Sequence, residues 1–164
     1  MRLSSTDIRY FLGEGLLKIS ADSQHSFCPE TQIRPGSVDI RISNIFWKFN
    51  KDCIAQLDII DLHQAKEILN NPELMYSKIQ LSEEEYLEIK PGEIVLTETL
   101  EKIEMPACIS GALKGRSSFA RLGISIHCTG DYINPGYQGS MPLQIINHSP
   151  IPVKLYAYLS IAQL

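Results

Sequence analysis

The stretch KGRSSFARLG, at residues 114–123, concentrates positive charge in a chain whose formal net charge is −4. Lys114, Arg116 and Arg121 supply that charge, and no acidic residue occurs between positions 105 and 130. A glycine-led turn that opens a short helix directs free backbone N–H groups outward, and arginine forks match the oxygens of phosphate. The stretch therefore predicts a turn that binds a polyanion.

Two serines and a glycine complete this turn. Ser117 and Ser118 lie between the arginines, where their hydroxyls can cap the helix or donate to a bound anion. Gly123 is placed to end the helix in a left-handed conformation. The spacing GxxxxGK[ST] of a P-loop is absent here. The alternative is a basic surface turn that only balances nearby acids, and the turn alone leaves both interpretations open.

Length and composition indicate one globular domain over residues 1–164, because 44% hydrophobic content suffices for a core. The excess of acidic residues argues against nucleic acid polymers and anionic membranes as partners. A local basic cluster on an acidic protein suits a small phosphorylated ligand better. No apolar run is long enough to span a membrane, and the first residues, MRLSS, lack a signal peptide's apolar core. The sequence predicts a cytoplasmic protein.

The cysteines occur singly, with no CxxC pair, so neither a disulfide framework nor a zinc site is expected. The H-x-E…P-C-x-x-C signature of zinc-dependent deaminases is also missing from the sequence. We expect no metal ligands in the chain and four small buried side chains instead: Cys28, Cys53, Cys108 and Cys128.

The hydrophobic pattern predicts a mainly β chain with few short helices. A helix is expected after residues 5–7 and a second over residues 61–69, each beginning at polar capping residues. Strands separated by Pro and Gly turns fill the remainder, a pattern typical of a barrel or a jelly-roll-like sandwich. The expected strands cover residues 38–42, 45–47, 87–89, 94–100, 109–113, 124–128, 143–146 and 153–158.

A longer series of motifs points to a known family. The sequence RSSFARLG at residues 116–123, followed by His127 and by INPGYQG at residues 133–139, closely resembles the signature of dCTP deaminases. That family is similar in fold to the trimeric dUTPases, so the resemblance implies a dUTPase-like distorted β-barrel with a short N-terminal helix. Further matches are MRL at the start, SVDIR at residues 37–41, PGE at residues 91–93 and IPVKLY at residues 151–156.

The resemblance also implies an activity and its partners. The expected reaction is hydrolytic, zinc-independent deamination of dCTP to dUTP and ammonia, a step of pyrimidine deoxynucleotide metabolism. Mg²⁺ would accompany the triphosphate of the ligand, which is dCTP or a related nucleotide such as dUTP or dTTP. The sites would lie between the subunits of a homotrimer. Relatives continue past residue 164 into a tail that covers the nucleotide; the sequence stops at Leu164, so either the protein lacks that lid or its chain continues beyond this residue.

By resemblance, the residues of the motifs take specific roles. Arg116, Ser117 and Ser118 would hold the triphosphate, and Arg121 would support the attacking water or the phosphates. The remaining nucleotide contacts would come from Thr129, Asn134 and Tyr137, although barrel packing is an equally good interpretation of the tyrosine.

Two amides stand where the family has acids. Gln144 aligns with a glutamate that takes a proton from water and returns it to ammonia, and Asn134 aligns with an aspartate. Asp131, the first acid after the acid-free window, is a candidate for the displaced carboxylate. His127 is interpreted as a hydrogen-bonding residue of the strand, since no acid or metal partner is evident.

These amides keep three functions open. The first is a dCTP deaminase that uses Arg121, Gln144 and Asp131 as its catalytic residues. The second is a relative that binds deoxynucleotides without turning them over, because amides preserve the shape of a site but not its proton transfer. The third, a dUTP diphosphatase, is disfavoured because Asn134 cannot activate water.

Overall fold

The computed structural model describes residues 2–55 and 59–164, apart from the side chains of residues 64 and 68. Within this part, six strands form the largest sheet: β1 (Lys18–Ser20), β4 (Ile45–Phe49), β5 (Tyr76–Gln80), β7 (Ile94–Glu104), β10 (Ile124–Ser125) and β12 (Gln138–Asn147). Their order is β10-β12-β7-β4-β5, and β1 pairs with β7 in addition. All these pairs are antiparallel.

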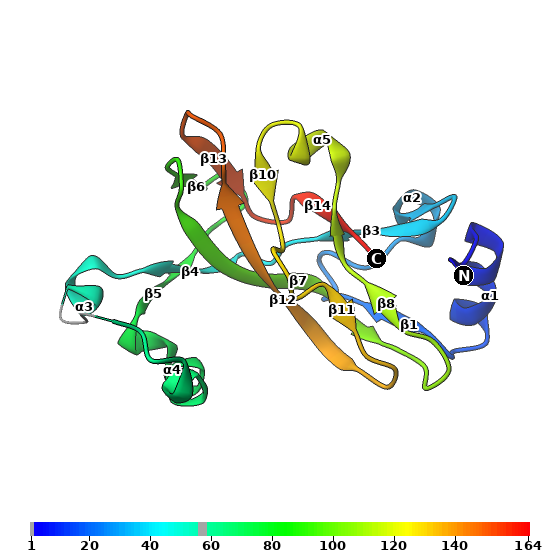
Figure 1. Cartoon of the computed structure of the whole chain (residues 1–164). Coiled ribbons are helices and arrows are strands. Elements are labelled where there is room, and N and C mark those ends of the chain that lie inside the picture. The colour runs from blue at the N-terminus through cyan, green and yellow to red at the C-terminus, as the bar shows by residue number, and fades with distance from the viewer. Residues whose placement is uncertain (1, 56–58) are drawn as a thin grey trace.

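The antiparallel pair of β7 and β12 crosses the middle of the molecule (Figure 1). Every second residue of β7 from Val95 to Ile103 is buried, as the two-residue period of a strand requires. The register of the pair runs from Gln138 opposite Glu104 to Ile146 opposite Ile94, with a bulge between Ser140 and Pro142. The bulge twists β12 more strongly, which curves the pair around the core.

A second sheet packs near the first and carries the end of the chain. Its strands are β2 (Ile33–Arg34), β3 (Ser37–Arg41), β9 (Lys114–Gly115) and β14 (Ser160–Gln163), in the order β2-β3-β14-β9. Two further pairs extend the arrangement: β8 (Gly111–Ala112) with β11 (Tyr132–Ile133), and β6 (Tyr86–Ile89) with β13 (Val153–Tyr156). The mainly β prediction is therefore confirmed.

The helices are short and lie outside the sheets. α1 (Ser5–Gly13) begins at a capping box between Ser4 and Asp7, which confirms the predicted N-terminal helix. The predicted helix at residues 61–69 is present as η1 (Leu62–Gln64) followed by α4 (Ala65–Asn70). The other helices are α2 (Pro29–Gln32), α3 (Lys51–Ile54), η2 (Pro72–Leu74) and α5 (Ser117–Ala120).

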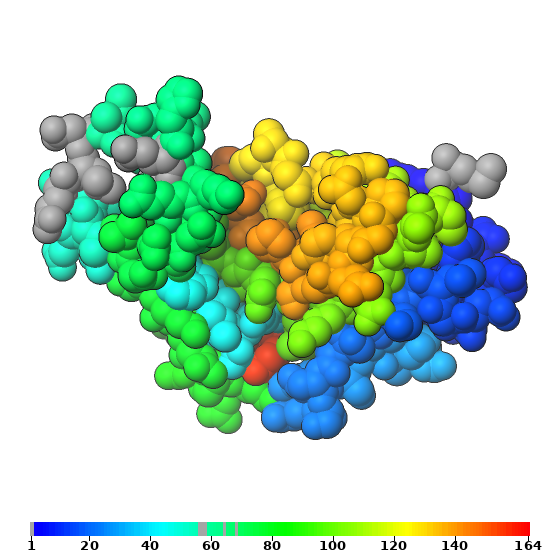
Figure 2. Space-filling view, turned by 90° about the horizontal axis from the view of Figure 1, so that it is seen from below, coloured from blue at the N-terminus to red at the C-terminus, as the bar shows by residue number. Residues whose placement is uncertain are grey.

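The segment that carries α3, η1, α4 and η2 stands at one end of the molecule, and the N-terminal residues stand at the opposite end (Figure 2). Leu62 and Leu69 lie on this segment and are 80% and 70% exposed. In the described part of the chain, no helix combines the length and the apolar character needed to cross a membrane.

The core fills the space between the sheets with aliphatic side chains and one phenylalanine. Its fully buried members include Ile40, Ile42, Phe46, Val95, Ile103, Leu113, Ile133 and Ile145. β3 is buried on both faces at its centre, although its sequence alternates apolar and polar residues, because Val38, Asp39 and Ile40 are all buried. β3 lies between β2 and β14, so it has neighbours on both sides, and Asp39 bonds Arg34 and Gln163.

Several sequence predictions need correction in length. β7 runs to Glu104 rather than residue 100. Its last three residues, 102–104, pair with β1, and the strand ends before Met105-Pro106. The strand expected at residues 124–128 ends as β10 at Ser125. The strands expected at residues 109–113 and 153–158 shorten to β8 and β13.

The prediction of four buried cysteines is also wrong. Cys108 and Cys128 are exposed, and Cys28 and Cys53 are half-buried, all as free thiols. Cys128 is exposed because β10 has ended before it, and Cys108 lies in the loop after Pro106.

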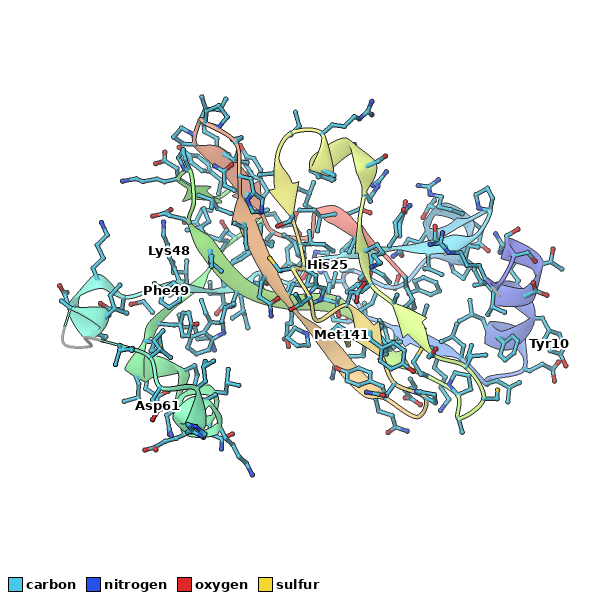
Figure 3. All side chains as sticks on the ribbon, in the orientation of Figure 1. Tyr10, His25, Lys48, Phe49, Asp61 and Met141 are labelled. Atoms are coloured by element: carbon cyan, nitrogen blue, oxygen red, sulfur yellow. The ribbon has the colours of Figure 1, made fainter. Side chains whose placement is uncertain are left out.

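A loop near the middle of the body is held by His25, which Figure 3 labels together with outward-pointing Tyr10 of α1. The ring nitrogens of His25 lie 3.2 Å from carboxylate oxygens of Asp22 and Glu83. Its ring stacks on Tyr158 with 3.9 Å between the centroids. These contacts tie the loop before α2 to the loop before β6 and to the residues before β14.

Candidate functional site

The basic turn folds as the sequence predicted, into a short helix that ends at a left-handed glycine. Arg116 is the residue before α5, and the backbone N–H groups of Phe119 and Ala120 both donate to its carbonyl. Gly123 has φ +81°, and a Cβ there would lie 2.9 Å from the backbone nitrogen of Ser149. Only glycine fits this position without displacing the neighbouring loop, so the glycine fixes where the helix stops.

Arg116 is aimed by two residues that the sequence analysis did not identify. Its Nη1 donates to the backbone oxygen of Ser160 at 3.0 Å and to the Ser160 hydroxyl at 3.2 Å. The carboxylate of Asp39 lies 3.9 Å from the same nitrogen, and its side chain is only 3% exposed. The two residues come from β14 and β3. Asp39 could have been identified from the sequence, because it is an acid within an apolar strand. Nothing in the sequence marks Ser160 in a comparable way.

The two serines of the turn are free to meet a ligand. Ser117 and Ser118 are exposed, and no side chain caps the start of α5. The capping role that the sequence allowed is therefore not used, and the hydroxyls remain as possible donors to an anion. Together with the half-buried Arg116, they form a cluster of polar donors on one side of the molecule.

Gln144 and His127 contact each other directly. His127 Nδ1 lies 3.3 Å from Gln144 Oε1, and the backbone nitrogen of Gln144 donates to Ile126 at 3.1 Å. Gln144 is half-buried between Leu143 and Ile145, whose side chains are buried in the core. The amide therefore lies on the face of β12 that points away from the core.

Asp131 pairs with Lys114 rather than with the amides. The Lys114 Nζ donates to Asp131 Oδ2, and the backbone nitrogen of Leu113 donates to the Asp131 carbonyl at 2.8 Å. Hydrogen bonding from Lys114 lowers the pKa of the Asp131 carboxyl, and the charges of Lys114 and His127 lower it further. A carboxylate with a lowered pKa is a weak base, which disfavours Asp131 as the proton acceptor of a reaction.

The Lys114→Met variant is expected to return the pKa of Asp131 toward the ordinary value of an aspartate, because the hydrogen bond and the positive charge are both removed. Carbon-detected NMR titration of the carboxyl groups measures this change. Asp7 is the matched control: its pKa is lowered by its bonds to Ser4, which the substitution does not touch. An Asp131 pKa that stays low in the variant would contradict the assignment to Lys114.

The lowered pKa of Asp131 determines how the Lys114–Asp131 pair changes the free energy of unfolding with pH. A lowered pKa in the folded state means that the ionised carboxylate is favoured on folding. The contribution of the Lys114–Asp131 pair is therefore present above the unfolded pKa and is lost as the pH falls through the folded pKa. In Lys114→Met this acid-sensitive contribution should disappear.

The remaining predicted site residues are placed around these clusters. Arg121, Thr129 and Asn134 are exposed. The Tyr137 hydroxyl donates to the backbone oxygen of Ser140 at 2.6 Å, which gives this side chain a structural bond. Burial raises the pKa of Tyr137, and the charge of Glu98 acts in the same direction. A packing role for Tyr137 therefore has a concrete basis.

A cavity of about 820 Å³ lies beside α1, β8 and the last residues of β14. Lys114 and Tyr132 line it, along with apolar residues such as Leu3, Met105 and Leu164. Arg116, Ser117 and Gln144 are not among its lining residues, so the cavity does not coincide with the cluster built on the basic turn.

A family model and curated relatives both match this chain along nearly its whole length. The family model described as dCTP deaminase-like matches residues 2–164. A protein of Dictyoglomus thermophilum named dCTP deaminase, dUMP-forming, is 34% identical over 164 residues, which are all of this chain and 78% of the relative. The protein of the same name from Corynebacterium kroppenstedtii is 36% identical over all of this chain and 80% of the relative.

A solved structure confirms the fold independently of these identities. The crystal structure of the 2'-deoxycytidine 5'-triphosphate deaminase from Agrobacterium tumefaciens superposes with a TM-score of 0.67 at 19% identity. The match covers 99% of this chain and 46% of that chain, so this chain spans less than half of the solved one. Sequence match, family model and fold agree, and the chain belongs to the dCTP deaminase-like family.

Proposed function

We propose that the protein binds dCTP and hydrolyses its 4-amino group, releasing ammonia. The observation that carries the proposal is the Arg116 guanidinium, aimed by Ser160 and Asp39 beside the free hydroxyls of Ser117 and Ser118. This set supplies a charged fork and two hydroxyl donors, which is the chemistry that a triphosphate needs. Membership of the dCTP deaminase-like family supports the same ligand.

The end product of the proposed reaction is dUMP. The motifs of the sequence predict dUTP as the product, but the two relatives described above are both named dUMP-forming. In the first step of the proposed reaction, one water replaces the amino group at C4 and ammonia leaves. A second water then releases diphosphate, so that dCTP and two waters give dUMP, ammonia and diphosphate.

The chain is expected to carry out the deamination slowly. The attacking water must give up a proton, and the leaving amino group must receive one. Gln144 cannot exchange protons at neutral pH, and Asp131 is held as a carboxylate by Lys114. Asn134 is likewise an amide at the position of a family acid. A missing general base typically lowers a rate about 10²–10⁴-fold.

Magnesium enters as part of the substrate. The described residues contain no cluster of three or more His, Cys, Asp or Glu that could hold a metal ion. Asp131 is engaged by Lys114, so this donor set fits a cation bound by the phosphate oxygens rather than by the protein. The proposed substrate is accordingly Mg²⁺–dCTP, and Arg116 and Arg121 would face its remaining phosphate charge. We further propose a homotrimer with sites between its subunits.

Binding without turnover is the second candidate, and the contact between Gln144 and His127 favours it. The amide is held at 3.3 Å by the imidazole, so the site keeps an ordered polar group where the family has an acid. A site with this geometry and no proton acceptor would retain a nucleotide as a sensor or a store does.

Product analysis separates these functions. The protein is incubated with Mg²⁺ and either dCTP or dUTP, and the nucleotides are separated by chromatography. Deaminated nucleotide from dCTP supports the proposal, with dUMP as the final species. Arg116→Ala serves as the control for the site and should weaken nucleotide binding in calorimetry. No product from either nucleotide, with binding intact, would replace the proposal by the second candidate; dUMP from dUTP alone would indicate a diphosphatase.

A further inference from the structure

The orientation of the Gln144 amide is fixed by its contact with His127. The atom that faces His127 Nδ1 at 3.3 Å is the amide oxygen, which can only accept a hydrogen bond. Nδ1 must therefore carry the hydrogen and donate it. The carbonyl end of the amide is occupied by this bond, and its NH₂ end has no hydrogen-bond partner among the residues that the structure describes.

The His127 ring and the backbone of Gln144 have further contacts. The Nε2 atom of His127 is buried and makes no hydrogen bond to the described residues, so the ring is packed on that side. The backbone of Gln144 is tied to Ile126 at 3.1 Å, and its neighbours Leu143 and Ile145 are buried. Met141, labelled in Figure 3, is also buried and precedes Gln144 on the same strand. The bond from His127 Nδ1 is therefore the contact that sets the direction of the Gln144 amide.

We propose that Gln144 makes this site select pyrimidine nucleotides that carry a carbonyl at position 4 over those that carry an amino group. The inference rests on the proposed function, with position 4 of the base placed at Gln144 because this residue aligns with the glutamate that transfers the protons of deamination in the family. The free NH₂ of the amide donates, so it matches the oxygen of a 4-oxo pyrimidine and opposes the amino group of cytosine. A glutamate at this position would accept only, with the opposite preference.

The selectivity has a consequence for turnover. Hydrolysis at C4 converts the amino group into a carbonyl, so the product matches the amide better than the substrate does. A site that leaves a buried donor unpaired loses about tenfold to a hundredfold in affinity. The deaminated nucleotide is therefore held more tightly than dCTP.

The matched ligands are the α,β-imido forms of dCTP and dUTP, because they differ only in the group at position 4 and the accompanying hydrogen at N3, and they resist release of diphosphate. Calorimetry with Mg²⁺ measures both dissociation constants, and chromatography after each titration checks that the nucleotide is intact. We expect wild type to bind the dUTP analogue about 10- to 100-fold more tightly. In Gln144→Glu the preference should reverse toward the dCTP analogue.

Two substitutions at His127 test the positioning. His127→Asn keeps an N–H donor near the place of Nδ1 and should retain the wild-type preference. His127→Leu removes the donor, so the Gln144 amide can rotate and present either its NH₂ group or its oxygen. The affinities for the dCTP and dUTP analogues should then become nearly equal. If His127→Leu fails to fold, the reversal in Gln144→Glu still decides the question.

The outcomes separate this inference from the function on which it rests. Equal or tighter binding of the dCTP analogue by wild type overturns the selectivity and leaves nucleotide binding standing. A preference unchanged by Gln144→Glu overturns the role of the amide. Binding of neither analogue by wild type overturns the proposed function and the inference together.

Discussion

Gln144→Glu is expected to raise the rate of dCTP deamination by about 10²–10⁴-fold, the usual contribution of a positioned general base. The substitution places a carboxylate where the amide now lies, on the face of β12 that points away from the core. His127 Nδ1 lies 3.3 Å from the present oxygen and can donate to one carboxylate oxygen. The second oxygen is then left to take the proton of the attacking water.

Release of ammonia from dCTP at saturating Mg²⁺–dCTP measures this gain, because it follows the deamination step alone. Gln80→Glu is the matched control: it makes the same chemical change at an exposed position of β5, and its rate should equal that of wild type. A Gln144→Glu protein that binds dCTP but releases no more ammonia would show that another part of the site has been lost as well. Asn134→Asp would then be the next substitution to combine with it.

The basic turn could be predicted from sequence because its determinants are local. The glycine that ends α5, the exposed serines and the arginine before them all lie within residues 114–123. The groups that aim Arg116 could not be found in this way. Asp39 and Ser160 come from strands distant in sequence, and only the pairing of β14 with both β3 and β9 brings them to the turn.

The contact between His127 and Gln144 shows the same limit. Each residue was selected from its own motif, yet the sequence offered no acid or metal partner for the histidine. The pairing of β10 with β12 places the imidazole beside the amide, which is a partner that a search for charged groups overlooks. Family resemblance found the positions, and the register of two strands supplied their interaction.

Glu101 is a residue that the strand period could have revealed. Val95, Thr97, Thr99 and Ile103 share the inward face of β7, so the residue at 101 must face inward as well. A glutamate at such a position requires partners from other elements. The structure provides them: Gln32 Nε2 at 2.8 Å, the Arg41 backbone nitrogen at 2.8 Å and Arg41 Nε at 2.7 Å.

Glu101→Gln is expected to lower the free energy of unfolding by about 3–5 kcal/mol, the usual cost of breaking a buried ion pair by removing one partner. The glutamine has nearly the same volume, so the loss does not come from a cavity. Its NH₂ group would face donors, and the Arg41 guanidinium, only 20% exposed, would lose its counter-charge. The bond from Arg41 Nη2 to the carbonyl of His25, at 2.6 Å, would remain as its principal anchor.

Urea unfolding followed by the fluorescence of Trp47, the single tryptophan of the chain, measures this loss at fixed protein concentration. Glu104→Gln is the matched control on the same strand. Glu104 pairs with Lys18 at 2.8 Å, but these side chains are 43% and 59% exposed, so the expected loss is at most about 1 kcal/mol. Equal losses in the two variants would contradict the assignment of Glu101 as a buried anchor. A large loss confined to Glu101→Gln would show that β3 and β7, and with them the Asp39 carboxylate beside Arg116, depend on this buried charge.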